Sequence, residues 1–96
     1  MARDGPLKSR TTADFRRMLD RLPADIRRAA DASYALFSTD PAHPSLQFKP
    51  LRGLANLYSA RVSLGYRAVG KKRDDGSIVW FWIGSHADYD RLLTTR

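Results

Sequence analysis

A chain of 96 residues, 43% of them hydrophobic, has room for one hydrophobic core, so we expect a single domain over residues 1–96. It has no cysteine, which excludes disulfides and cysteine-based zinc sites, and no apolar run reaches the roughly 18–20 residues that span a bilayer. Seventeen Lys and Arg against ten acids give a net charge of +7, which points to a nucleic acid or an acidic protein as partner. The polar N-terminus lacks the apolar core of a signal peptide, so we expect a cytoplasmic protein with no membrane partner.

Helical spacing dominates the first half of the chain. Before it, residues 1–5 are expected to be frayed and residues 7–11 to form a short edge strand. Two apolar series then follow with the spacing of one helix face: Phe15, Met18, Leu19 and Leu22, and Ile26, Ala29, Ala30, Ser33, Tyr34 and Phe37. Thr12 before Asp14 is typical of a helix N-cap, and Pro23 is typical of a break between helices. This half of the chain therefore predicts a helical hairpin.

From residue 46 onwards the apolar spacing changes to two. Leu46 and Phe48 alternate with polar residues, which predicts a short strand, and residues 58–64 predict a longer strand that is buried on one face. Gly65 is expected to reverse the chain into a partner strand over residues 66–70. The second half therefore begins with antiparallel strands.

The C-terminal third completes the sheet. Residues 74–77, Asp-Asp-Gly-Ser, are typical of a hairpin turn. Residues 78–83 are apolar throughout and predict a central strand buried on both faces, and residues 86–93 predict a short amphipathic helix. Because the helices precede a run of strands instead of alternating with them, the predicted fold class is α+β.

Basic side chains and one histidine near the predicted sheet are the candidates for chemistry. Arg61 and Arg67 lie on two adjacent strands, so we expect their guanidinium groups to converge on one face and bind phosphate. Lys49 is expected on a strand nearby. His86 follows the most buried strand and is the side chain suited to proton transfer at neutral pH. Tyr89, three residues further on, is placed to stack on a base or to donate a proton.

Each candidate also has an ordinary structural interpretation. The two arginines and Lys49 fit a solvated basic surface, His86 fits a structural hydrogen bond, and Tyr89 fits core packing. Trp80 and Trp82 are expected in the core. Composition and spacing alone leave both interpretations open.

Four stretches carry a family resemblance: PSLQFKPLRG (44–53), LYSARV (57–62), GYRAV (65–69) and WIGSHADY (82–89). In this order they resemble the RelE/ParE superfamily of toxins from bacterial toxin–antitoxin systems, and the similarity extends over residues 15–93. The resemblance implies a helical hairpin packed on a four-stranded, mainly antiparallel twisted sheet, with a short C-terminal helix. It also implies a cognate antitoxin as partner and no cofactor or metal.

The resemblance further implies roles for individual residues, because RelE-like members of the superfamily cleave mRNA in the ribosomal decoding site. Arg67 matches the transition-state arginine of that branch, and Arg61 matches a basic position on the preceding strand. His86 and Tyr89 match the terminal element, where a histidine often serves as acid or base. Lys49 falls where some relatives carry a catalytic glutamate, and since this chain has no Glu, the general base is left unassigned.

The sequence therefore predicts a metal-independent endoribonuclease, an mRNA interferase, whose partners are mRNA and the ribosome and whose action inhibits translation. Two alternatives remain. ParE-like members of the superfamily poison DNA gyrase, and a basic domain also fits a non-catalytic module that binds nucleic acid.

Overall fold

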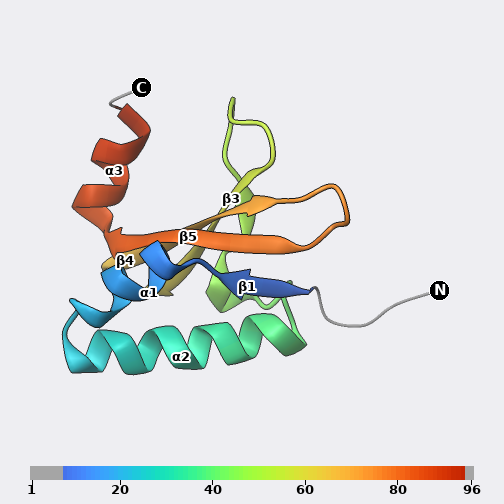
Figure 1. Ribbon diagram of the computed structural model, residues 1–96. Helices are drawn as coiled ribbons and strands as arrows, with labels where there is room; N and C mark the ends of the chain where they lie inside the picture. The colour runs from blue at the N-terminus through green and yellow to red at the C-terminus, as the bar shows by residue number, and fades with distance from the viewer. Residues whose placement is uncertain (1–7, 95–96) are drawn as a thin grey trace.

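The computed structural model describes residues 8–94, which form a five-stranded sheet and three α-helices (Figure 1). The elements in chain order are β1 (Ser9–Thr11), α1 (Ala13–Asp20), α2 (Ala24–Thr39), a 3-10 turn (Pro44–Leu46), β2 (Lys49–Pro50), β3 (Leu57–Ser63), β4 (Tyr66–Lys72), β5 (Ile78–Ser85) and α3 (His86–Thr94). The α+β class is confirmed. Residues 1–5, which we expect to be frayed, lie outside the described residues. Within the described range, no helix is both long enough and apolar enough to cross a membrane.

The sheet has five strands in the order β1-β5-β4-β3-β2, which corrects the expected number of four. β1 runs parallel to β5, with Ser9 opposite Ile78, while the other three pairings are antiparallel. The expected edge strand near the N-terminus is confirmed for the described residues 9–11. A three-residue segment has too little periodicity to reveal a partner almost 70 positions away, which is why its place in the sheet was not predicted.

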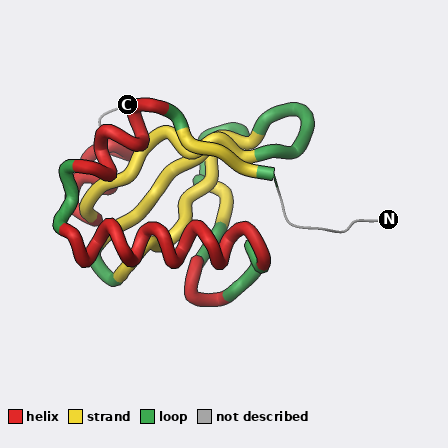
Figure 2. The backbone as a smooth tube through the Cα atoms, turned by 60° about the horizontal axis from the view of Figure 1, so that its bottom comes forward, coloured by secondary structure: helices red, strands yellow, loops and turns green. Residues whose placement is uncertain are grey.

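The two N-terminal helices cover one face of the sheet, and α2 lies along that face (Figure 2). Helix α1 begins where predicted, because the Thr12 hydroxyl accepts a hydrogen bond from the backbone N–H of Phe15 at 3.0 Å. Pro23 precedes α2, as its fixed backbone angle favours. The Ser33 hydroxyl of α2 donates to the Val62 carbonyl at 3.1 Å and ties the helix to β3.

The main core lies between these helices and the sheet. Ala60, Ala68, Trp80 and Ile83 face the helices, where they meet Phe15 and Phe37. Trp80 and Ile83 share this face although they are three residues apart, because the β4–β5 register shifts between Val69 and Gly70, where an extra residue of β5 interrupts the alternation. The Phe37 ring meets the Trp80 ring edge to face at 5.3 Å between centroids. Gly70 pairs with Trp80 across the β4–β5 ladder, and a Cβ on Gly70 would come within 2.8 Å of the indole. The absence of a side chain at Gly70 is therefore what lets the indole lie flat against the sheet.

Two strand predictions require correction. The short strand expected over residues 46–49 starts later than predicted: Leu46 ends a 3-10 turn, and Gln47 adopts a left-handed conformation with φ 46°, so ladder pairing starts only at Lys49. The strand over residues 78–83 exists but is not buried throughout, since Phe81 and Trp82 are only half-buried. Trp80 is a core residue as expected, while Trp82 lies on the other face.

Candidate active site

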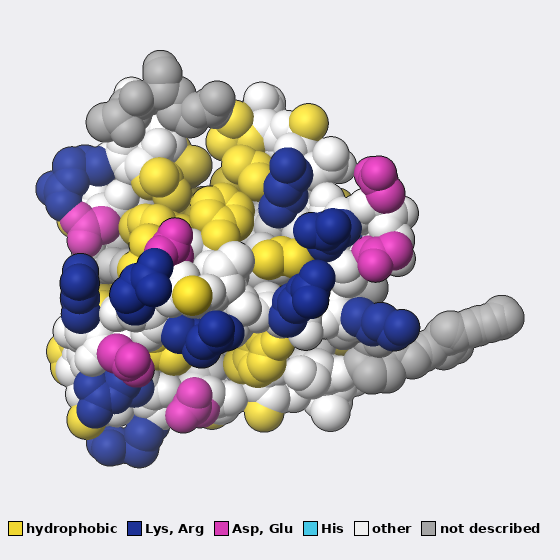
Figure 3. All heavy atoms as spheres, in the orientation of Figure 1, with side chains coloured by type: hydrophobic (Ala, Val, Ile, Leu, Met, Phe, Trp, Pro, Cys, Tyr) yellow, Lys and Arg dark blue, Asp and Glu magenta, His cyan; other side chains and the backbone are white. Residues whose placement is uncertain are grey.

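The face of the sheet opposite α1 and α2 is only partly covered. Helix α3 and the loop of residues 51–56 rise from it on either side (Figure 1). A small second cluster lies there, with Leu51, Val69 and Tyr89 buried and further apolar side chains, Phe81 and Trp82 among them, half-buried. Figure 3 shows hydrophobic side chains gathered between α3 and this loop, with Lys and Arg side chains around them. We call this surface the open face.

Strand register places most of the predicted site residues on the open face. Arg61 pairs with Arg67, and Arg67 pairs with Gly84, so these three positions form one row across β3, β4 and β5. Directly opposed residues carry their side chains on the same face of a sheet. In the neighbouring row Lys49 pairs with Ser59, and Ser59 pairs with Val69, which belongs to the cluster of the open face.

Arg67 is the best-positioned cation of this face. Its Nη2 donates to the Gln47 Oε1 at 3.0 Å, and its guanidinium carbon lies 5.6 Å from the centre of the Tyr89 ring. Its Nη1 is buried and has no hydrogen-bond partner. Among the described residues, no carboxylate lies within salt-bridge distance of this guanidinium. Arg67 is therefore a half-buried, oriented charge that nothing in the described chain neutralises.

The Tyr89 ring lies close to both Arg67 and His86. It is 7% exposed, and its ring centroid lies 6.0 Å from that of His86 and 6.3 Å from that of Trp82. Burial confirms the core-packing interpretation of Tyr89. The same ring also forms the surface against which the Arg67 guanidinium rests, a cation–π arrangement.

His86 is the first residue of α3 and is anchored through its backbone. Its N–H donates to the Gly65 carbonyl at 2.7 Å, which ties the start of the helix to the β3–β4 turn. The side chain is 53% exposed, and its Nε2 lies 3.7 Å from the Asp90 carboxylate. The backbone of His86 is thus held firmly while its imidazole is open to a ligand.

The remaining two candidates are less directly connected to Arg67. Arg61 is half-buried and adjacent to Arg67 by register, although atoms of Arg61 also line a cavity on the helix side. Lys49 is exposed on the edge strand β2, two strand spacings of about 4.8 Å each from β4. The structure therefore brings Arg67, Tyr89 and His86 together, places Arg61 beside them, and leaves Lys49 at the margin.

Sequence reasoning missed two residues that shape this site. Gln47 was predicted as a strand residue, and nothing in the local pattern announces the left-handed turn that aims its amide at Arg67. Trp82 was predicted as core, yet its indole lies on the open face, where a Cβ on Gly84 would come within 2.9 Å of it. The available signal was Gly84, two residues after Trp82, because a glycine inside a strand often marks the close approach of another group.

Comparison with known proteins identifies the family of this chain. The sequence model of the ParE-like toxin domain family matches residues 24–91. A chain of the toxin–antitoxin complex RelBE2 from Mycobacterium tuberculosis is 30% identical, with 84% of this chain and 99% of that one covered and a TM-score of 0.59. No curated protein matches.

More distant structures share the fold. A chain of the RelB–RelE antitoxin–toxin complex from Methanococcus jannaschii is 19% identical, covers 84% of this chain and 95% of its own length, and has a TM-score of 0.67. The isolated RelE toxin of E. coli is 16% identical, with coverages of 91% and 95% and a TM-score of 0.62. The fold is thus that of RelE toxins, and the chain belongs to the ParE-like toxin domain family.

Proposed function

We propose that this protein is the toxin of a toxin–antitoxin pair and that it is a metal-independent endoribonuclease, which cleaves mRNA in the ribosomal decoding site and so inhibits translation. The observation that carries the proposal is the unneutralised guanidinium of Arg67 on the open face. A half-buried cation whose Nη1 has no hydrogen-bond partner is costly, whereas an RNA phosphate supplies both an acceptor and the missing negative charge.

RNA cleavage without a metal needs three contributions. A base removes the proton of the 2′-hydroxyl, and the freed oxygen attacks the adjacent phosphorus. Cations stabilise the charge that develops on the phosphorane, and an acid protonates the departing 5′-oxygen, which leaves a 2′,3′-cyclic phosphate. Preorganised charges such as Arg67 and Arg61 supply the second contribution without reorganisation during the reaction.

Proton transfer falls to His86 in this proposal. Its imidazole is exposed at the rim of the open face, and Tyr89 links it to Arg67. A positioned histidine contributes typically about 10²–10⁴-fold to such a step. Because Tyr89 is buried, we assign it the positioning of Arg67, and we assign Lys49, exposed at the margin, a contact to the RNA backbone.

An antitoxin is the second proposed partner. The 30% identical relative was crystallised in a toxin–antitoxin complex, which supports the same assembly here. Cleavage within the decoding site also implies action in the cytoplasm, beside the ribosome.

The decisive experiment compares two activities of the purified protein. Ribosomes programmed with a defined mRNA are incubated with the wild-type protein, Arg67→Ala and His86→Ala, and the cleaved mRNA is mapped. A DNA gyrase supercoiling assay runs in parallel, because the family model bears the name of the gyrase-directed branch. We expect wild-type cleavage of mRNA that both substitutions reduce at least 100-fold. Inhibition of gyrase without mRNA cleavage would instead establish the alternative function.

A further inference from the structure

A cavity of about 230 Å³ lies on the helix side of the sheet, away from the open face. Its deep wall is apolar and includes the buried residues Phe15, Ala30, Phe37, Ala68, Trp80 and Ile83. Protein interiors hold few voids larger than a water molecule, and an engineered apolar cavity of about 150 Å³ already binds benzene. This cavity therefore has room for a molecule larger than a single ring.

The cavity has a polar mouth between the two N-terminal helices. Arg16 of α1 and Asp31 and Tyr34 of α2 line it and are exposed. Arg16 is held at the mouth, where its Nη1 donates to the carbonyl and hydroxyl of Thr11 at 3.0 Å each. A ligand can thus reach the apolar interior from solvent by passing between α1 and α2.

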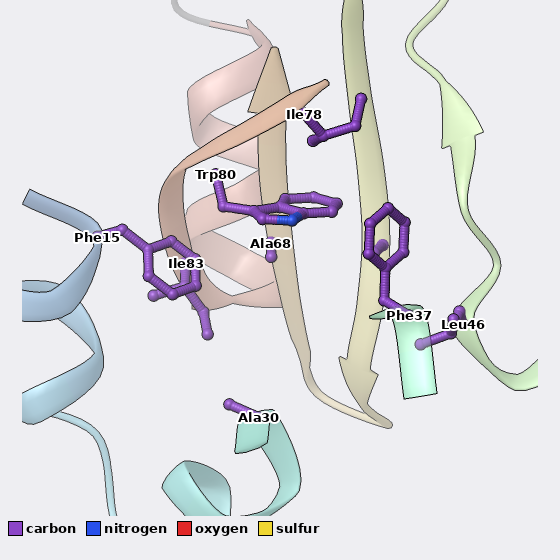
Figure 4. Packing of buried hydrophobic residues seen from close by; sticks show 9 residues of the cluster. Phe15, Ala30, Phe37, Leu46, Ala68, Ile78, Trp80 and Ile83 are labelled. Carbon is purple, nitrogen blue, oxygen red and sulfur yellow. The ribbon is translucent and has the colours of Figure 1, made fainter. Parts of the chain in front are cut away.

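One buried donor lacks a partner at the inner wall. Trp80 is 3% exposed, and its Nε1 makes no hydrogen bond. Figure 4 shows the nitrogen edge of the indole turned towards the side on which Ala30 lies, which is the side of the cavity. Burial of an N–H without an acceptor is destabilising. The Ser33 hydroxyl, which also lines the cavity, donates to Val62 and makes no hydrogen bond with this indole N–H.

We propose that this cavity binds a small, neutral, mainly apolar molecule of about two fused rings with one hydrogen-bond acceptor, which takes the Trp80 N–H. The proposed ligand is neutral because the fully buried lining residues carry no charge, and the charged ones, Arg16, Asp31 and Arg61, are exposed or half-buried. Apolar walls with one convergent polar group are typical of small-molecule sites. The buried wall of the site lies across the sheet from Arg67, and the only residue shared with the proposed active site is Arg61, so the inference does not rest on the proposed function.

The test uses 1-indanone, which carries one ketone acceptor, and indane, which has the same rings without it. Each is titrated into ¹⁵N-labelled protein, and the indole N–H signals of the two tryptophans are followed by NMR. We expect both compounds to perturb residues that line the cavity, but only 1-indanone to move the Trp80 indole signal downfield. At ten times its Kd, 1-indanone should raise Tm by roughly 6–10 °C. No perturbation of cavity residues by either compound at millimolar concentration would overturn the proposal.

Matched leucine substitutions on α2 locate the binding. Ala30→Leu extends a side chain into the cavity, whereas Ala35→Leu adds the same atoms at an exposed position of the same helix that does not line it. We expect Ala30→Leu to weaken 1-indanone binding at least ten-fold and Ala35→Leu to leave it unchanged. Equal binding to both variants would show that the compound sits elsewhere, which would also overturn the proposal.

Trp80→Phe tests the hydrogen bond itself. This substitution removes the N–H while an aromatic ring remains, so the preference for 1-indanone over indane should fall about three- to ten-fold relative to the wild-type protein. An unchanged preference would exclude the role of the indole N–H. Should Trp80→Phe fail to fold, the downfield shift in the wild-type protein decides the same point.

Discussion

The availability of the Arg67 charge to an anion depends on Gln47, the residue that orients the guanidinium. Gln47 accepts from Nη2 with a neutral amide, which fixes the direction of the guanidinium without neutralising it. A carboxylate at the same position would form a charge-assisted bond about twice as strong and would compensate the cation. The choice of a neutral partner therefore keeps Arg67 available for an anion.

The first prediction concerns this pair. Gln47→Glu preserves the shape of the side chain, so the fold should persist, and the new ion pair should leave Tm unchanged or slightly higher. Cleavage of mRNA on programmed ribosomes should fall at least ten-fold, because the carboxylate competes with the phosphate for Arg67. Single-turnover cleavage rates and thermal unfolding provide the measurements.

Gln47→Asn is the matched control. Asparagine is neutral and tolerates the left-handed backbone at this position, where φ is 46°. We expect a smaller loss of activity than for Gln47→Glu. If the glutamate variant cleaved as fast as the wild-type protein, the charge of Arg67 would have no part in the reaction.

His86 provides the second prediction. His86→Ala should reduce single-turnover mRNA cleavage at least 100-fold, because proton transfer is assigned to its imidazole. Stability should change by less than about 1 kcal/mol, since the exposed pair with Asp90 is worth about 0–1 kcal/mol and the anchoring bond to Gly65 comes from the backbone. Asp90→Ala removes that pair but keeps the ring, so it should stay active. An active His86→Ala variant would return His86 to a structural role.

The sequence predicts which residues of adjacent strands lie close together, but it does not predict contacts that pass through irregular turns. The register of adjacent strands follows from their alternation, which is why the proximity of Arg61 and Arg67 was predictable. The contact between Gln47 and Arg67 joins positions 20 residues apart through a left-handed turn, and no periodic pattern encodes it. Whether the candidates act in catalysis stays a prediction.

At the scale of elements, each face of the sheet accommodates one tryptophan by means of a glycine. Trp80 lies against Gly70 on the helix side, and Trp82 lies against Gly84 on the open face. Trp82 in turn contacts Tyr89, the ring that supports Arg67. Packing within strand β5 is thereby coupled to the position of the catalytic candidates on β4 and α3.

The third prediction tests this coupling. A Cβ at Gly84 would lie 2.9 Å from the Trp82 ring, so Gly84→Ala should displace the indole, cost about 1–3 kcal/mol of stability and reduce mRNA cleavage. Gly65→Ala is the control, because a Cβ there meets nothing within 4 Å and should change stability by less than about 0.5 kcal/mol. Chemical denaturation measures the stability of both variants, Trp fluorescence reports displacement of the indole, and cleavage on programmed ribosomes measures activity. Equal stability of the two variants would show that Trp82 moves aside without cost.

The long, strongly periodic elements were predictable, whereas the short strands were predictable only in part: an edge strand was expected near residues 9–11, but its pairing with β5 was not. The two N-terminal helices, strands β3, β4 and β5, the β4–β5 turn and helix α3 all appear near their predicted positions. The turn at residues 74–77 is stabilised as its residue types suggest: the Asp75 carboxylate accepts from the Ser77 hydroxyl and N–H, which lowers the pKa of that carboxyl. By contrast, β1 and β2 contain three and two residues, and long-range pairing alone defines them.

At the scale of the whole molecule, the two faces of the sheet differ in how they are covered. The helix side contains the larger cluster of buried residues, while the open face combines half-buried aromatic residues with Arg67, which no carboxylate of the described residues neutralises. A net charge of +7 adds a long-range attraction for polyanions. Together these features favour a nucleic acid as the ligand of the open face.

The last prediction measures that interface through its salt dependence. Cations that neutralise phosphates release counter-ions, and each contact with a single strand contributes about 0.7 to the slope of log K against log salt concentration. With a 2′-O-methyl RNA that resists cleavage, Arg61→Ala and Lys49→Ala should each reduce the slope by about 0.7, as measured by fluorescence anisotropy. Arg17→Ala is the control, because Arg17 lies on α1 and is already paired with Asp14. If all three variants kept the wild-type slope, RNA phosphates would not contact Arg61 or Lys49, and the open face would have to bind its ligand through Arg67 and the aromatic residues alone.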